Sequence, residues 1–82
     1  MNFNIYPNPV STTLYVTFAA PQSGQKTKLS ITDMMGRVVY FDEFDRTDRM
    51  TKKINVSSLM KGVYVVTVDT GYDILTARII KD

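Results

Sequence analysis

Four carboxylates lie close together in the sequence and are the residues best suited to chemistry. They are Asp42, Glu43, Asp45 and Asp48. Paired carboxylates can act as general acid and base when a cleft separates their pKa values, and several carboxylate oxygens from one loop can bind calcium. However, Arg46 and Arg49 are interleaved with the acidic residues, and the segment lacks the glycine and the final glutamate of an EF-hand loop. We therefore interpret it as a solvated hairpin end between two strands, with calcium binding as the alternative.

The residue types that the chain lacks exclude most other catalytic chemistry. Its 82 residues include no cysteine and no histidine. Thiol nucleophiles, imidazole bases, Ser-His-Asp triads and Cys/His zinc sites are therefore impossible within this chain. Its four glycines are isolated from one another, so they form no phosphate-binding loop. We expect no enzyme activity, no cofactor and no metal site.

The composition is that of a small folded domain with a mild positive charge. Hydrophobic residues make up 44% of the chain, which is enough for one modest core. The net charge of +2 comes from dispersed basic side chains, so we expect no nucleic-acid binding. No apolar run approaches the roughly 18 residues of a membrane span, and the N-terminus shows no signal peptide. Either the protein is cytoplasmic, or its export signal lies outside this sequence.

Apolar and polar residues alternate in several short segments, which is typical of β-strands with one buried face. Residues 13–19 and 27–33 show this pattern clearly, and residues 62–69 carry apolar side chains on both faces. The last of these segments therefore predicts a central strand that is covered on both sides. Turn-forming residues at 21–25, 33–36 and 70–73 separate the segments.

The spacing of these segments predicts an all-β fold, namely an immunoglobulin-like antiparallel β-sandwich of about seven strands. Pro7 and Pro9 bias Tyr6 and Asn8 away from the helical region, which predicts a rigid corner after a short first strand. By alternation, the side chains expected in the core are Leu14, Val16, Phe18, Leu29, Ile31, Ile54, Val56, Tyr64, Val66 and Val68.

Four motifs occur in order along the chain. They are Y-P-N-P-V-S at 6–11, L-S-I-T-D-M-M-G-R-V-V at 29–39, I-N-V-S-S-L-M-K-G-V-Y-V-V-T-V at 54–68 and A-R-I-I-K at 77–81. Each is weak alone, but in this order and at this length they resemble the type A C-terminal sorting domain of the type IX (Por) secretion system. The resemblance covers residues 4–81. It implies that residues 1–82 are a single sorting domain excised from a larger exported protein.

The resemblance implies a function in protein export rather than in catalysis. It implies an upstream cargo in cis, an outer-membrane translocon that recognises the domain, and a sortase-like enzyme that removes it. The cargo would reach the cell surface or the medium through the periplasm. The residues that match the family's motifs are Pro7, Asn8, Pro9, Asp33, Gly36, Arg37, Leu59, Gly62, Tyr64, Ile79, Ile80 and Lys81.

Most of these residues have an ordinary structural role to play, and the tail is the exception. We expect Gly36 and Gly62 to serve backbone conformation and Tyr64 to fill the core. Because a strand alternates its faces, Ile79 and Ile80 cannot both point inward, so one of them should be exposed. An exposed edge strand is also a template on which a partner can add a strand. We expect recognition at this tail.

The alternative to a sorting function is a generic immunoglobulin-like adhesion or carbohydrate-associated module that serves a secreted enzyme as spacer or binder. An aromatic platform on one sheet face would favour it. The tyrosines that could build such a platform are Tyr6, Tyr15, Tyr40, Tyr64 and Tyr72.

Overall fold

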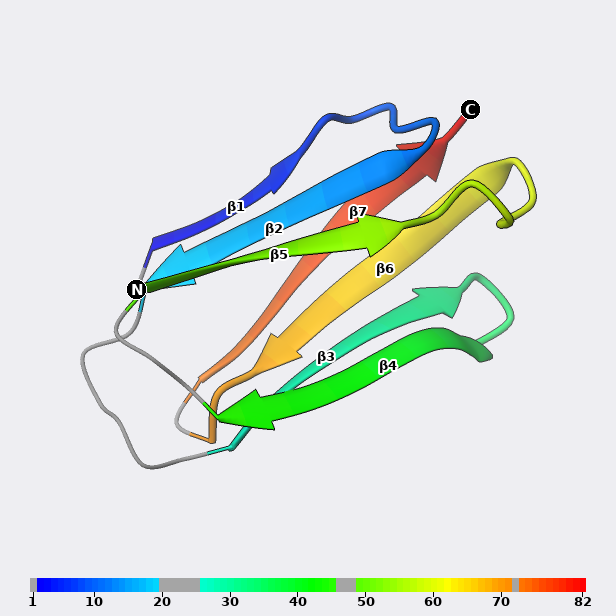
Figure 1. The fold of residues 1–82 in the computed structure, drawn as a ribbon. Helices are drawn as coiled ribbons and strands as arrows, with labels where there is room; N and C mark the ends of the chain where they lie inside the picture. Colours follow the sequence, from blue (N-terminus) through cyan, green and yellow to red (C-terminus); the bar gives the residue numbers. More distant parts are fainter. Residues whose placement is uncertain (1, 20–25, 46–48, 72) are drawn as a thin grey trace.

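The residues that the structure describes form seven antiparallel β-strands (Figure 1). The structure is a computed structural model, and it describes residues 2–19, 26–45, 49–71 and 73–82. The strands are β1 (Asn2–Tyr6), β2 (Thr13–Ala19), β3 (Lys26–Asp33), β4 (Val38–Asp45), β5 (Arg49–Asn55), β6 (Gly62–Asp69) and β7 (Ile74–Lys81). No helix occurs among the described residues, and hence none that could cross a membrane. The turn predicted at 21–25, together with Arg46, Asp48 and Tyr72, lies outside them.

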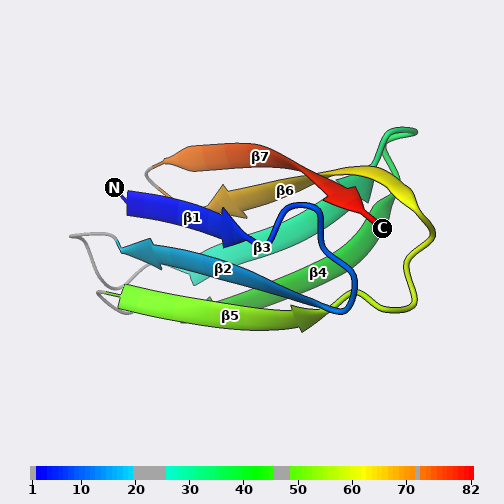
Figure 2. The same ribbon diagram turned by 90° about the horizontal axis from the view of Figure 1, so that it is seen from above.

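The strands form two sheets that pack face to face. One sheet has the order β1-β2-β5 and the other the order β4-β3-β6-β7. Seen from above, the two sheets lie as separate layers with their strands roughly aligned (Figure 2). The all-β sandwich predicted from the sequence is confirmed.

The core lies between the two sheets and is built from alternate residues of each strand. All ten side chains expected in the core are buried. The register explains why, because Leu29 and Ile31 of β3 lie beside Val68 and Val66 of β6 in the same cross-strand rows. Two further buried hydrophobic residues among those described, Val10 and Ile79, were not in the predicted set. Both belong to the end of the sandwich that carries the candidate site.

Two expectations about strands need correction. Strand β6 is central, between β3 and β7, but it is not covered on both sides. Its outward residues Val63 and Val65 are half-buried by their neighbours in the sheet, and no described element forms a third layer over them. The acidic segment is also not a hairpin end as far as it is described, because Asp42, Glu43 and Asp45 belong to β4.

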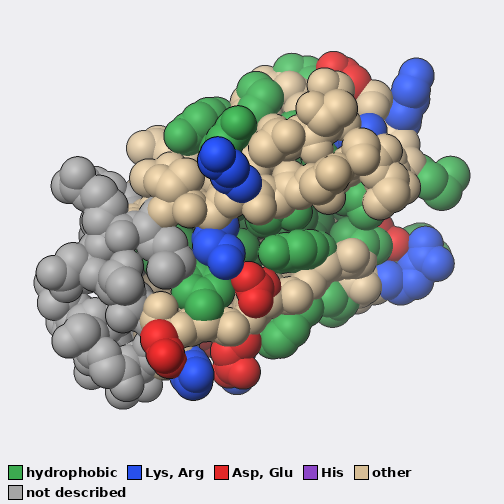
Figure 3. Space-filling view, in the orientation of Figure 1, with side chains coloured by type: hydrophobic (Ala, Val, Ile, Leu, Met, Phe, Trp, Pro, Cys, Tyr) green, Lys and Arg blue, Asp and Glu red, His purple; other side chains and the backbone are tan. Residues whose placement is uncertain are grey.

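Two acidic residues of β4, Asp42 and Asp45, pair with lysines instead of gathering in a loop. Asp42 points between the sheets, where its Oδ2 lies 3.0 Å from Nζ of Lys52 in β5. The same ammonium group lies 4.6 Å from the ring centroid of Phe44, a cation–π distance. Since β4 and β5 are edge strands of different sheets, this contact joins the sheets along one side of the sandwich. Figure 3 shows basic and acidic side chains interspersed with hydrophobic ones on the face that β4 and β5 present.

The first prediction tests which face of β6 forms the core. Val66 is fully buried, whereas its neighbour Val65 points to the opposite face. Val66→Ala should lower the free energy of unfolding by about 1–3 kcal/mol, because it removes two methyl groups from a packed site. Val65→Ala is the matched control and should cost less than about 1 kcal/mol. Denaturant titrations of both variants give the comparison, and equal midpoints for the two would contradict the assignment of faces.

Candidate functional site

All four motifs identified in the sequence come together at one end of the sandwich. The β1–β2 connection, the β3–β4 turn, the β5–β6 connection and the end of β7 lie at the same end in both ribbon views (Figures 1 and 2). We call this end, formed by residues 7–12, 33–37, 56–62 and 78–82, the motif end. The acidic residues of β4, Asp42, Glu43 and Asp45, lie in the second half of that strand, away from the motif end.

One cross-strand row connects three of the motifs. Asp33, the last residue of β3, is the register partner of Tyr64 in β6. Tyr64 is in turn the partner of Ile79 in β7. The motif residues are therefore neighbours across the sheet although they are far apart in the sequence. This row is the structural basis of the motif end.

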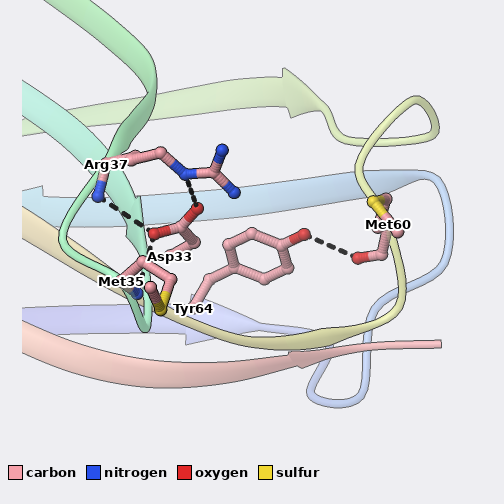
Figure 4. Close-up of polar contacts among 5 residues, drawn as sticks. All are labelled: Asp33, Met35, Arg37, Met60 and Tyr64. Atoms are coloured by element: carbon pink, nitrogen blue, oxygen red, sulfur yellow. Dashed lines mark hydrogen bonds and ion pairs between the residues drawn. The ribbon is translucent and has the colours of Figure 1, made fainter.

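The β3–β4 turn is organised by the carboxylate of Asp33. Its Oδ1 accepts hydrogen bonds from the backbone N–H groups of Met35 and Arg37, both at 2.9 Å. Its Oδ2 lies 2.9 Å from Nε of Arg37 (Figure 4). Gly36 has a φ of 86°, a conformation that residues with a Cβ rarely adopt. As expected, this glycine serves the backbone, since the space around its missing Cβ is open.

These contacts lower the pKa of Asp33 below its ordinary value. The main cause is the hydrogen bond from the backbone N–H of Arg37, supported by the Arg37 side chain and the N–H of Met35. Partial burial of the carboxyl acts in the opposite direction and is outweighed. The ionised carboxylate is therefore the form that holds the turn.

The β5–β6 connection is held by Tyr64 and by two turn residues. The hydroxyl of Tyr64 donates a 2.6 Å hydrogen bond to the backbone carbonyl of Met60, and its ring is buried (Figure 4). Leu59 packs against the core from the connection, and its N–H donates to the carbonyl of Val56 at 3.0 Å. Gly62 has a φ of 152° at the point where β6 begins. Tyr64 fills the core as expected, and its hydroxyl also positions the loop.

The entry corner is bound to the end of β7. Asn8 lies between two prolines that both follow cis peptide bonds. Its Oδ1 accepts a hydrogen bond from the N–H of Ile80 at 2.9 Å, and its Nδ2 donates to the carbonyl of Arg78 at 3.2 Å. Val10 continues the contact as an isolated parallel bridge to Lys81. The first and last motifs are thus one structural unit.

The tail has the two-faced character that alternation predicts. Ile79 is 1% exposed and Ile80 is 47% exposed, so one isoleucine points into the core and the other to solvent. Lys81 follows the parity of Ile79 and is buried, and its Nζ donates to the backbone carbonyl of Asp82 at 2.9 Å. The open edge that the sequence suggested is only partly open, because the entry corner covers it at residues 78–82.

Neither an acidic site nor an aromatic platform is formed by the described residues. No group of three or more Asp or Glu side chains among them converges on a point where a metal ion could bind. Tyr6 and Tyr15 stack on each other with ring centroids 5.4 Å apart, so each ring covers one face of the other. Tyr64 is buried in the core. Tyr40 is half-buried, and its own burial together with the nearby Asp42 raises the pKa of its hydroxyl.

The second prediction concerns pH and the Asp33 turn. A carboxylate whose pKa is lowered by folding contributes stability above its ordinary pKa, here 3.8, and loses it as the pH falls through the lower folded-state value. Asp33→Ala should therefore melt below the wild type at neutral pH, and the difference should shrink as the pH falls below 3.8 and through the lowered pKa of the folded state. Asp45→Ala, which removes an exposed ion pair with Lys26, is the control and should change Tm little at neutral pH. A difference between Asp33→Ala and wild type that persists unchanged in acid would show that the turn does not depend on the carboxylate's charge.

Comparison with known protein families gives a match over nearly the whole chain. A family model described as the secretion system C-terminal sorting domain matches residues 4–82. No curated protein matches the chain significantly. Because the match covers nearly all of the sandwich, including all four motifs of the motif end, the chain belongs to the Por secretion tail family, whose members are C-terminal sorting signals for type IX secretion.

Proposed function

We propose that residues 1–82 are a single, non-catalytic sorting domain whose motif end is recognised by the outer-membrane translocon of the type IX system. Family membership implies export to the cell surface or exterior, contact with the secretion machinery and attachment to a cargo. We further propose that the cargo precedes the domain in the same chain and crosses the periplasm. A sortase-like enzyme would then remove the domain after passage through the outer membrane.

The observation that carries the proposal is the convergence of the motifs in one row, Asp33–Tyr64–Ile79, with Asn8 bound beside it. Antiparallel topology by itself places alternate connections at one end, so the main support comes from the contacts that join the motifs there, above all those of Asn8 with the end of β7. The motif residues divide by exposure. Tyr64, Ile79 and Leu59 hold the end together from inside, whereas Ile80 and Arg37 are exposed to a partner.

Exposed apolar side chains accompany Ile80 at the motif end. Met34, Met35 and Met60 are all exposed on the two loops that Asp33 and Tyr64 organise. Methionine side chains are flexible and adapt to apolar partner surfaces. A receptor surface with an apolar centre would match Ile80 and these methionines, and Arg37 would lie at its rim.

No specific observation favours the adhesion or carbohydrate-binding alternative. A sugar platform needs aromatic ring faces that lie flat toward solvent. Among the described residues, Tyr6 and Tyr15 stack one face of each ring against the other, and Tyr64 is buried in the core.

The third prediction tests recognition at the tail without disturbing the core. A signal peptide and a fluorescent protein are fused ahead of Asn2 in a strain with the type IX machinery. Wild-type fusion should reach the surface or the medium with the domain removed. Ile80→Ser should reduce export about tenfold, which corresponds to ~1.4 kcal/mol of lost binding and is less than full burial of an isoleucine can supply. Cell fractionation with a fluorescence readout measures the effect.

Ile74→Ser is the matched control for this experiment. Ile74 lies on the same strand and points to the same face, is 67% exposed, and is at the opposite end from the motifs. Both variants should melt close to the wild type, because both side chains are exposed. If Ile74→Ser and Ile80→Ser are exported equally well, recognition does not involve the motif end's isoleucine. Deleting residues 79–82 is a poorer test, because Ile79 is part of the core.

A further inference from the structure

The outer edge of β7 is closed over only part of its length. Strand β7 is the last strand of its sheet, with β6 on one side only. At residues 78–82 its other side is occupied by residues 8–10 of the same chain. At Ile74–Ala77 no described strand pairs with that side. The outer edge of β7 therefore has an open half, residues 74–77, and a half that residues 8–10 of the same chain cover, residues 78–82.

Residues 8–10, which cover this half of the edge, form hydrogen bonds to β7 as a neighbouring strand would, through both side-chain and backbone groups. The carboxamide of Asn8 offers one acceptor and one donor, and these satisfy the N–H of Ile80 and the carbonyl of Arg78. Two backbone bonds follow: the N–H of Val10 donates to the carbonyl of Ile80 at 2.8 Å, and the N–H of Asp82 donates to the carbonyl of Val10 at 2.9 Å. Together they reproduce the hydrogen-bonding pattern of a short parallel neighbour.

The cover is held unevenly. The side chain of Val10 is fully buried and anchors one end in the core. Pro7, Asn8 and Pro9 are exposed, and neither proline has an N–H with which to extend the pairing. Beyond the carboxamide of Asn8, the cover therefore has no further donor with which to reach along β7. A partner strand that starts on the open half can offer a backbone N–H and C=O at every second residue.

We propose that the outer edge of β7 is a binding site for an extended peptide strand, and that residues 8–10 are a latch that closes its second half. A partner strand pairs with Ile74–Ala77 first and then displaces the latch to continue along residues 78–82. The ligand class is an edge strand or extended segment of another protein, recognised through backbone groups alone, so Ile74→Ser leaves the pairing groups of this edge in place. The role of this binding in export rests on the proposed function, but the latch itself does not.

The fourth prediction tests whether the latch opens as a unit, by amide hydrogen exchange of the full chain in Asn8→Ala. The amide of Ile80 loses its acceptor in this variant, so its faster exchange alone proves nothing. The informative amide is that of Asp82, which donates to Val10 and not to Asn8. If residues 8–10 open together, Asp82 should exchange about tenfold faster, the size expected for a lost hydrogen bond. The amide of Val66 in the core should exchange at its wild-type rate.

Two outcomes would overturn the latch. Faster exchange at Ile80 with no change at Asp82 would show that Asn8 and Val10 are held independently. Equal acceleration at Asp82 and Val66 would show that the segment opens only with the whole sandwich. Asn4→Ala is the matched control, since Asn4 lies on the outer face of β1 and should leave all three rates unchanged.

A disulfide lock tests the role of opening in export. Val10 and Lys81 are bridge partners, as required for a disulfide between neighbouring strands, and the chain has no other cysteine to interfere. In the export assay, the oxidised double variant Val10→Cys/Lys81→Cys should stay in the periplasm, while the same double variant kept reduced with dithiothreitol should be exported. Export of the oxidised double variant at the level of its reduced form would overturn displacement of the latch by a partner. Loss of export in wild type would instead refute the proposed function and leave the exchange result to decide the latch.

Discussion

Burial of one apolar layer between two sheets is the constraint on which the rest of the structure depends. A chain of this size with no disulfide must place nearly every inward side chain of its strands in that layer. The layer sets the register, because a slip of one residue would turn each strand's apolar face to solvent. Register in turn places Asp33, Tyr64 and Ile79 in one row. The recognition surface that we propose is thus a by-product of core packing at one end of the sandwich.

Within that end, polar groups do the positioning and apolar groups are left free. The Asp33 carboxylate uses both oxygens on its own turn, the Tyr64 hydroxyl is committed to Met60, and the Asn8 carboxamide is committed to β7. These contacts satisfy backbone groups that would otherwise be unpaired where strands end. The side chains that remain available for a partner are mainly apolar or basic, which is suited to a protein surface more than to a small polar ligand.

The sequence was sufficient for the features that depend on local pattern. Alternation identified ten core residues and the two faces of Ile79 and Ile80, and turn chemistry identified Asp33 and Gly36. Features that depend on which strands become neighbours were not accessible. The contact of Asn8 with Ile80 joins residues 72 positions apart, and no local signal predicts it. The burial of Val10 and of Lys81 was missed for the same reason, although Lys81 shares the parity of Ile79. The pairing of Asp42 with Lys52 requires the two sheets to be stacked, so the acidic segment was misjudged as a hairpin end.

The closure of β7 by residues 8–10 also has a consequence for timing. In a chain that is made and translocated from its N-terminus, residues 8–10 emerge early. Their partners, residues 78–82, lie farthest from them in the sequence and emerge last. Such long-range pairing cannot form until the last segment is available, and it makes folding slower than local pairing would. In such a chain the motif end cannot be complete before residues 78–82 are available. A receptor that reads the assembled end would engage only chains that have been delivered in full, and a truncated chain would carry no complete signal.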